Sequence, residues 1–205
     1  KINNMKKNFK ALLMLGIVLS VGFTACEEED TTPTPTPVVY GEVNSYSAKM
    51  MGGQNNDTLG SFLATDNGEV ITSSAAGAST AVQARVDLVY FYGTSNQASM
   101  GAPNDSVVAI AHTGSTSLPN WTTKNATKFV KTTITPAQFI ASANDSLVKT
   151  IDAATISGSL VNMLVSGNVV AFKTAGGKLG LFHVQSVDGT TGTDRSITIN
   201  VKVQE

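Results

Sequence analysis

The stretch Ile197-Thr198-Ile199-Asn200-Val201-Lys202-Val203 alternates strictly between aliphatic and polar side chains. Successive side chains of a β-strand point to opposite faces, so this alternation predicts a strand with one buried and one solvated face. Residues 169–174 and 178–187 precede it, and Ala175-Gly176-Gly177 between them is a turn signal. The pattern therefore predicts a three-stranded antiparallel meander in the C-terminal part of the chain.

The segment Val86-Asp87-Leu88-Val89-Tyr90-Phe91-Tyr92 is apolar on both faces after its first residues, which predicts a central strand. Glycine, asparagine and serine are frequent between the apolar segments of this chain, as in all-β folds with many turns. We expect a mainly β fold, a β-sandwich or open barrel of about eight strands with one or two short helices. Further short strands are predicted at residues 39–46, 61–65, 69–72, 106–112 and 128–134.

Two segments have helical signals. Thr135-Pro136-Ala137-Gln138 places threonine at the N-cap, proline at the first helical position and glutamine at the third, which is a capping box. The second segment has Leu160, Met163 and Leu164 at helical spacing and ends at Ser166-Gly167. We expect both helices to cover an end or an open edge of the sheet.

Acidic and basic residues are distributed unevenly along the chain. All fifteen acidic residues follow Cys26, whereas four of the fourteen basic residues precede it. Residues 38–205 are nearly neutral and have no basic stripe, which argues against nucleic acid as a partner. Their number is enough for a single β-rich domain with one core.

The N-terminal segment has the features of a secretory leader. Lys6 and Lys7 precede an apolar stretch at residues 11–23, whose length of about 13 residues falls short of a membrane span. Residues 1–25 are therefore predicted to be a signal peptide. Phe23-Thr24-Ala25-Cys26 resembles the lipobox of lipoprotein precursors, and this resemblance implies that Cys26, the single cysteine, is lipidated and anchors the protein to a membrane. Ordinary cleavage that leaves a lone thiol is the alternative.

Residues 26–37 form a linker between the predicted lipid and the domain. Glu27-Glu28-Glu29-Asp30 is followed by alternating threonine and proline, which keep a chain extended. The acidic run looks like the export tag that carries Bacteroidota lipoproteins to the outer face of the outer membrane. The resemblance implies a lipid-anchored protein exposed at the cell surface. The alternative is a solvated linker that directs nothing.

Several short motifs inside residues 38–205 resemble a domain of Bacteroidota surface lipoproteins that have no established activity. The resemblance covers most of the domain and brings no catalytic residue or cofactor with it. The motifs are Gly52-Gly53-Gln54-Asn55, Gly60-Ser61-Phe62, the strand at 86–92, Ala102-Pro103-Asn104-Asp105 and Val170-Ala171-Phe172-Lys173-Thr174.

Few residues point to catalytic or metal chemistry. His112 and His183 are the two histidines, and the domain has no cysteine, so a zinc site would have to recruit carboxylates. We predict no metal, no cofactor and no catalytic residue. Asp87 is expected on the same face of its strand as Val89 and Phe91, and a buried or half-buried acid needs a partner, for which Arg85 is the nearby candidate.

A short motif of aspartate, hydroxyl residue and aliphatic residue occurs three times, at residues 57–59, 105–107 and 145–147. It is similar to the O-glycosylation acceptor pattern of Bacteroidota, and the similarity implies sugar on Thr58, Ser106 and Ser146. The alternative is ordinary turn chemistry, since Asn-Asp-Ser sequences favour turns and caps.

Aromatic residues suggest a contact surface. Trp121 lies in a polar region, where its indole would stack on a sugar ring or instead plug the end of the sandwich. Tyr40 and Tyr46 are further candidates. The function expected first is non-enzymatic binding of a glycan or another envelope component, for example an envelope protein. An assembly subunit that pairs through sheet edges and a hydrolase whose acids meet only in the fold are the alternatives.

Overall fold

The computed structural model describes residues 38–54, 56–114, 118–190 and 194–205. Val38–Glu205 forms one compact unit. No helix in the described ranges has both the length and the apolar character that crossing a bilayer requires. The predictions for Cys26, the leader and the acidic linker fall outside the described residues.

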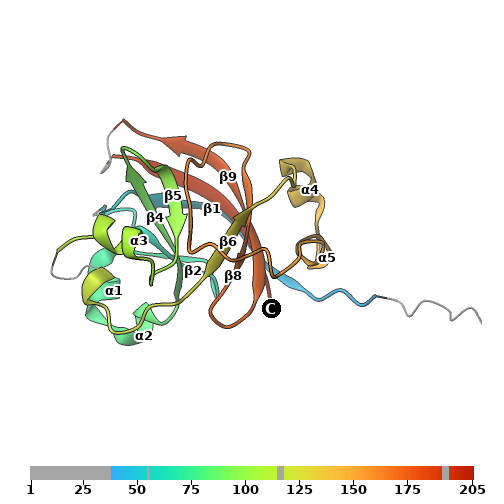
Figure 1. The fold of residues 1–205 in the computed structure, drawn as a ribbon, viewed down its shortest axis with the longest axis horizontal. Coiled ribbons are helices and arrows are strands. Elements are labelled where there is room, and N and C mark those ends of the chain that lie inside the picture. The colour runs from blue at the N-terminus through green and yellow to red at the C-terminus, as the bar shows by residue number, and fades with distance from the viewer. Residues whose placement is uncertain (1–37, 55, 115–117, 191–193) are drawn as a thin grey trace, which may run out of the picture. The chain divides into compact units, whose positions relative to one another are not determined.

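The described residues contain two antiparallel five-stranded sheets, which confirms the mainly β, sandwich-like fold (Figure 1). In order across the first sheet, the strands are β1 (Val43–Gly52), β10 (Ser196–Gln204), β9 (Leu179–Asp188), β8 (Val169–Lys173) and β6 (Lys128–Lys131). In the second sheet they are β3 (Glu69–Ile71), β2 (Phe62–Ala64), β4 (Val86–Gly93), β5 (Gln97–Gly101) and β7 (Leu160–Val161).

Short helices flank both sheets. One group lies beside β2, β4 and β5, and the other lies beside β6, β8 and β9 (Figure 1). The first group comprises α1 (Ser73–Ala78), α2 (Thr80–Gln83), α3 (Ser106–Ala111) and the 3₁₀ turn η1 (Leu118–Asn120). The second comprises α4 (Pro136–Ala141) and α5 (Ser146–Lys149).

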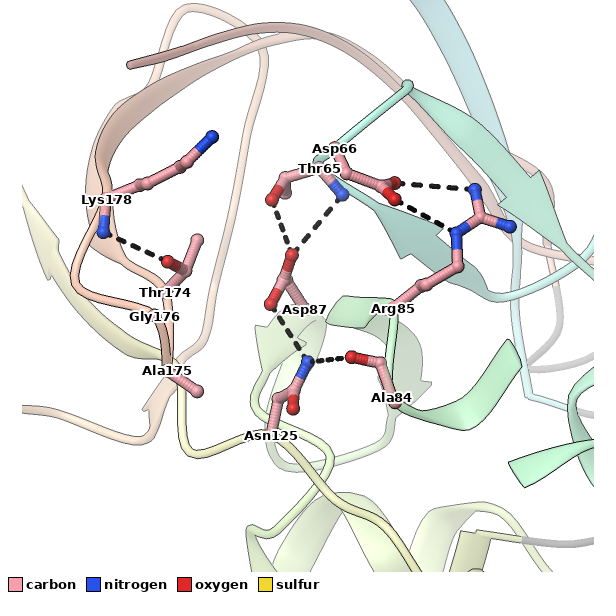
Figure 2. Close-up of a pocket in the computed structure, with 10 residues that line it drawn as sticks. All are labelled: Thr65, Asp66, Ala84, Arg85, Asp87, Asn125, Thr174, Ala175, Gly176 and Lys178. Atoms are coloured by element: carbon pink, nitrogen blue, oxygen red, sulfur yellow. Dashed lines mark hydrogen bonds and ion pairs between the residues drawn. The ribbon is translucent and has the colours of Figure 1, made fainter. Parts of the chain in front are cut away.

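The predicted meander is present as β8, β9 and β10. The turn between β8 and β9 is closed by a hydrogen bond from the Thr174 backbone N–H to the Lys178 carbonyl at 2.9 Å. The Lys178 N–H also donates to the Thr174 hydroxyl at 3.1 Å (Figure 2). Gly177 has φ +87°, in the left-handed region that glycine reaches without a steric penalty.

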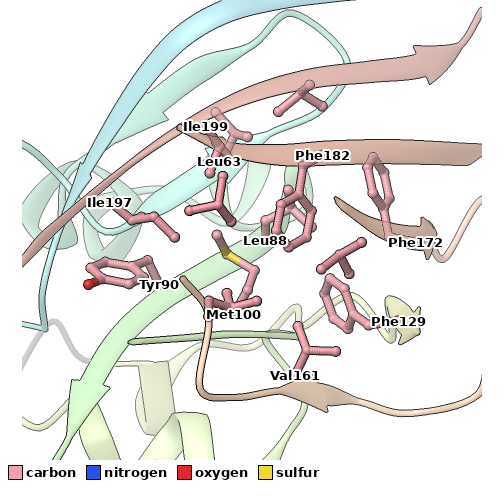
Figure 3. Packing of buried hydrophobic residues seen from close by; sticks show 14 of the residues in the cluster. Leu63, Leu88, Tyr90, Met100, Phe129, Val161, Phe172, Phe182, Ile197 and Ile199 are labelled. Atoms are coloured by element: carbon pink, nitrogen blue, oxygen red, sulfur yellow. The ribbon is translucent and has the colours of Figure 1, made fainter. Parts of the chain in front are cut away.

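The main core fills the space between the two sheets. Leu88, Tyr90 and Met100 of the second sheet lie opposite Phe182 and Ile197 of the first (Figure 3), and none of these five side chains is measurably exposed. The alternating aliphatic residues of β10 all point into this cluster, as the pattern of polar and apolar residues predicted.

Each sheet also buries part of its outer face. In β4, Val89 and Phe91 point away from the central core into a cluster shared with α3 and η1. On the first sheet, Leu181 packs with Phe139 of α4 and Val148 of α5. This double burial explains why residues 86–92 are apolar on both faces. The helices therefore cover sheet faces, whereas the sequence suggested an end or an edge.

Two predicted elements are wrong. Residues 106–111 form α3 instead of a strand, because the Asp105 side chain caps the helix by accepting from the Val107 and Val108 N–H groups at 2.8 and 3.2 Å. The helix predicted to end at Gly167 is replaced by β7 and an irregular turn, in which Met163 adopts φ +51°. The predicted capping box at Thr135 is present at the start of α4.

Substituting Gly68 tests a close contact between the β2–β3 turn and the side chain of Tyr46 in β1. Gly68 has φ +69°, and an added Cβ would lie 2.4 Å from Cγ of Tyr46. We expect Gly68→Ala to lower the free energy of unfolding by about 2 kcal/mol or more, measured by urea denaturation. The protein for this test is the soluble chain, residues 26–205 carrying Cys26→Ser.

Gly177→Ala is the matched control, because Gly177 also has positive φ but has no atom within 4 Å of the added Cβ. Its loss of unfolding free energy, about 1 kcal/mol, measures the cost of placing alanine at a positive φ without a steric clash. Equal losses in the two variants would show that the ring of Tyr46 does not pack on Gly68.

Candidate functional site

A polar pocket of about 270 Å³ lies between the β8–β9 turn and the second sheet. The turn supplies Thr174 and Lys178 to one wall, and Thr65, Asp87 and Asn125 lie across the gap (Figure 2). Thr65 follows β2 and Asp87 is the second residue of β4. The β2–β4 register shifts beside Asp87, since Leu63 pairs with Leu88 and Ala64 with Val86. We call this the Asp87 pocket.

Asp87 is 8% exposed and makes hydrogen bonds through both carboxyl oxygens. Oδ2 accepts from the Thr65 hydroxyl at 2.5 Å and from the Thr65 backbone N–H at 3.4 Å. Oδ1 accepts from Nδ2 of Asn125 at 3.1 Å. A carboxylate has about four lone-pair sites, so these bonds leave it acceptor capacity for a ligand.

Burial raises the pKa of Asp87 above its ordinary value of 3.8, and the negative charge of Asp66 acts in the same direction. The hydrogen bonds from Thr65 and Asn125 oppose this shift because they favour the charged form. Asp87 therefore takes up a proton at a higher pH than an exposed aspartate does.

Asn125 fixes the loop that brings it to Asp87. Its Nδ2 donates to the carbonyls of Ala84 and Val86, each at 2.9 Å, as well as to Asp87. The amide therefore holds the loop against the start of β4 through hydrogen bonds. This role could not be predicted from the sequence, because a single asparagine in a polar loop has no distinguishing pattern.

Arg85 does not pair with Asp87, contrary to the sequence prediction. Its guanidinium binds Asp66 at 3.0 Å and Glu69 at 2.9 Å (Figure 2 shows the bonds to Asp66). Arg85 precedes β4 and so does not share the in-strand orientation of Asp87. The charged residues that line the pocket are two acids, Asp66 and Asp87, and two bases, Arg85 and Lys178.

Trp121 is a core residue. It is 5% exposed, and its ring centroid lies 4.8 Å from that of Phe62 in the outer cluster of the second sheet. This position agrees with the plug interpretation, since an indole buried in this way presents no face to a sugar ring. Trp121 does not line the Asp87 pocket.

The two candidate tyrosines lie apart from the pocket lining. Tyr40 is 47% exposed, and Nζ of Lys149 lies 5.9 Å from its ring centroid. Tyr46 is half-buried, and its hydroxyl donates to the Asp66 carbonyl at 2.8 Å. Tyr46 thus supports the backbone of a pocket residue.

The three predicted glycosylation sites differ in accessibility. Thr58 and Ser106 are exposed, and Ser146 is half-buried. The preceding aspartates all make structural hydrogen bonds, and that of Asp105 is the local capping that the alternative describes. Asp57 accepts from the Ser74 N–H at 3.1 Å, Asp105 caps α3, and Asp145 accepts from the Gly41 N–H at 2.7 Å.

Both histidines are buried and lie outside the Asp87 pocket. His112 is 1% exposed, and its Nε2 lies 3.2 Å from the Tyr90 carbonyl. His183 packs against Phe139 with a centroid distance of 5.6 Å. Among the described residues, no three histidine, cysteine or acidic side chains are grouped so that they could hold a metal ion.

The fold is similar to that of a DUF4466 family protein from Parabacteroides merdae ATCC 43184, with a TM-score of 0.60 at 16% sequence identity. The match covers 80% of this chain and 54% of the solved chain, so this chain spans about half the length of that protein. At this identity the likeness shows the fold. The neighbour comes from the Bacteroidota, the lineage that the sequence motifs resemble. No protein-family model and no curated protein matches the chain.

Proposed function

We propose that this chain is a lipid-anchored surface protein whose sandwich binds a neutral, hydroxyl-rich ligand of the glycan type in the Asp87 pocket. The observation that carries the proposal is a largely buried carboxyl group facing a polar pocket whose charged residues balance. The two acids and two bases of the pocket balance, so a strongly anionic ligand would be repelled by the acids and a strongly cationic ligand by the bases.

The polar groups of the pocket suit sugar hydroxyls. The Asp87 carboxylate accepts hydrogen bonds, and Lys178 at the opposite wall donates them. A pocket of about 270 Å³ lies at the lower end of the range for small-molecule sites, so it would hold a small ligand or the terminal unit of a longer glycan. The turn that carries Lys178 is held by its own hydrogen bonds, which makes this wall preformed.

Replacing Asp87 tests the binding proposal. We expect Asp87→Asn to weaken binding of the glycan that scores highest on an array by about tenfold or more, since the charged acceptor is lost. For the wild type, affinity should fall as the pH is lowered through the raised pKa of Asp87, because the protonated acid is a poorer acceptor. Titration calorimetry across pH measures both effects.

Asp152→Asn is the matched control, because Asp152 is an exposed acid that does not line the pocket. It should leave both the affinity and its pH dependence unchanged. If Asp87→Asn binds the same glycan as tightly as the wild type does, the pocket is not the binding site.

A hydrolase is the second candidate function, because Asp66 and Asp87 line the same pocket. Asp87, with its raised pKa, suits a general acid, and Asp66 would supply the second carboxylate beside Arg85. Incubating the bound glycan with the protein and measuring new reducing ends separates the two functions. Cleavage that is abolished by Asp66→Asn would establish the hydrolase. A glycan that stays intact would support binding without hydrolysis.

The assembly alternative gains no support from the longest edge strand. β1 lies at the edge of its sheet, but its pairing register shifts between Tyr46 and Lys49, and Ala48 there adopts φ +49°. Such bulges interrupt the row of groups that a partner strand would pair with.

The surface location rests on the sequence alone and has its own test. We expect labelled palmitate to be incorporated into the wild-type chain and not into the Cys26→Ser variant, which should leave the membrane fraction. External protease should remove the domain from intact cells. Membrane association that survives Cys26→Ser would contradict lipid anchoring.

A further inference from the structure

A second cavity, of about 360 Å³, shares no lining residue with the Asp87 pocket. Its lining includes Tyr92 at the end of β4, Gln97 at the start of β5, Met163 and Val165 from the turn after β7, and Arg195 before β10. We call it the Arg195 cavity. The proposed glycan site leaves it unused.

One wall of the Arg195 cavity is apolar and accessible. Met163 and Val165 are 56% and 58% exposed, although both are large hydrophobic residues. Leu164 between them is buried in the central core and fixes the turn in place. Val187 of β9 adds a half-buried aliphatic side chain to the lining. This wall offers a surface to an apolar ligand group.

Arg195 supplies a positive charge to the same cavity. Its guanidinium carbon lies 4.3 Å from the ring centroid of Tyr92, which holds the side chain by a cation–π contact. Nε of Arg195 is buried and has no hydrogen-bond partner among the described residues. The nearby acids Asp188 and Asp194 accept from Ser186 and Thr190, and no ion pair joins either of them to Arg195 within the described ranges.

The backbone around the cavity is strained. Of the three described non-glycine residues with positive φ, Gln97 at +55° and Met163 at +51° both line it. Two hydrogen bonds of 2.9 Å hold these segments together, from the Met163 N–H to the Asn96 carbonyl and from the Leu164 N–H to the Ala98 carbonyl. Strain of this kind is concentrated at ligand sites, where the surrounding structure maintains it.

We propose that the Arg195 cavity binds an organic carboxylate with an apolar body, as in a medium-chain fatty acid. The apolar body lies against Met163 and Val165, and the carboxylate accepts from the guanidinium of Arg195. An ionised acceptor forms a stronger hydrogen bond with a guanidinium N–H than a neutral acceptor does. A carboxylate therefore fits the cavity better than an alcohol or an amine of the same length.

The test compares octanoate, octanol and octylammonium, which share one apolar body and differ in charge. In the soluble chain, amide shifts of residues lining the Arg195 cavity should move on titration, and octanoate should bind about tenfold or more tightly than octanol. Octylammonium should bind no better than octanol. Equal affinities for octanoate and octanol, shifts confined to another region, or no binding would overturn the proposal.

Variants assign the preference to the guanidinium. Arg195→Gln should reduce octanoate affinity to that of octanol, whereas Arg195→Lys, which keeps the charge, should retain part of the preference. Lys178→Gln is the matched control, since it removes a cation from the Asp87 pocket and should leave octanoate binding unchanged. A thermal melt confirms that each variant is folded. A preference that persists in folded Arg195→Gln would contradict the assignment.

Discussion

Trp121→Ala is expected to destabilise the domain by about 3 to 5 kcal/mol, the usual cost of truncating a buried aromatic residue. Trp121 is 5% exposed and contacts Phe62, which is itself fully buried, beneath the helices of the second sheet. Removing the indole leaves a cavity between β2 and the α3–η1 layer that the surrounding side chains cannot fill. Urea denaturation of the soluble chain, followed by circular dichroism, measures the loss.

Tyr40→Ala is the comparison for this prediction, because Tyr40 is an aromatic residue at 47% exposure. It should cost about 0.5 kcal/mol or less. The pair of variants also distinguishes the two interpretations of Trp121. A Trp121→Ala protein that keeps its stability and loses glycan binding would restore the sugar-stacking interpretation.

Acidification from pH 6.5 to about 4 is expected to remove about 3 kcal/mol of stability through His112. Burial lowers the pKa of this histidine from 6.5 to about 4, so the folded state holds the neutral ring. Below pH 6.5 the unfolded chain binds the proton first, and the stability falls until the folded pKa is reached. The lowered pKa of His183 acts in the same direction, whereas the raised pKa of Asp87 acts in the opposite one.

His112→Gln should reduce the loss of unfolding free energy between pH 6.5 and about 4, since an amide can donate to the Tyr90 carbonyl without titrating. The measurement is the free energy of unfolding in urea at half-unit steps of pH, for the variant and the wild type. His183→Gln serves as the control for the other buried ring and should retain most of the slope. Parallel curves for His112→Gln and the wild type would contradict a neutral buried His112.

Where local chemistry and tertiary packing agree, the sequence predicted the fold. The alternation at Ile197–Val203, the glycine turn at Gly177 and the capping box at Thr135 are all present. A strand was predicted at residues 106–112 because the β-branched residues there suit strands. The prediction is wrong because Asp105 caps a helix at this point, and that helix buries Val108. β5 was missed because its small residues, Ala98, Ser99 and Gly101, give no strand pattern.

The Asp87 pocket could be predicted only in part. The sequence identified Asp87 as a buried or half-buried acid of β4, and its side chain is buried. Simple alternation does not fix its face, because the β2–β4 register shifts at this residue. Its partners could not be found this way, since Thr65 and Asn125 are 22 and 38 residues away and meet it only in the folded chain. Proximity in sequence suggested Arg85 instead, and that residue binds other acids.

The proposed binding function requires that Asp87 accept hydrogen bonds from a hydroxyl-rich ligand. The decisive measurement is carbon-13 NMR of the Asp87 carboxyl group, titrated across pH with and without the glycan selected on the array. We expect the pKa of Asp87 in the free protein to lie above 3.8 and to fall when the glycan is bound, because ligand hydroxyls stabilise the charged form. A carboxyl pKa that is the same in both titrations, while the glycan is bound, would contradict it.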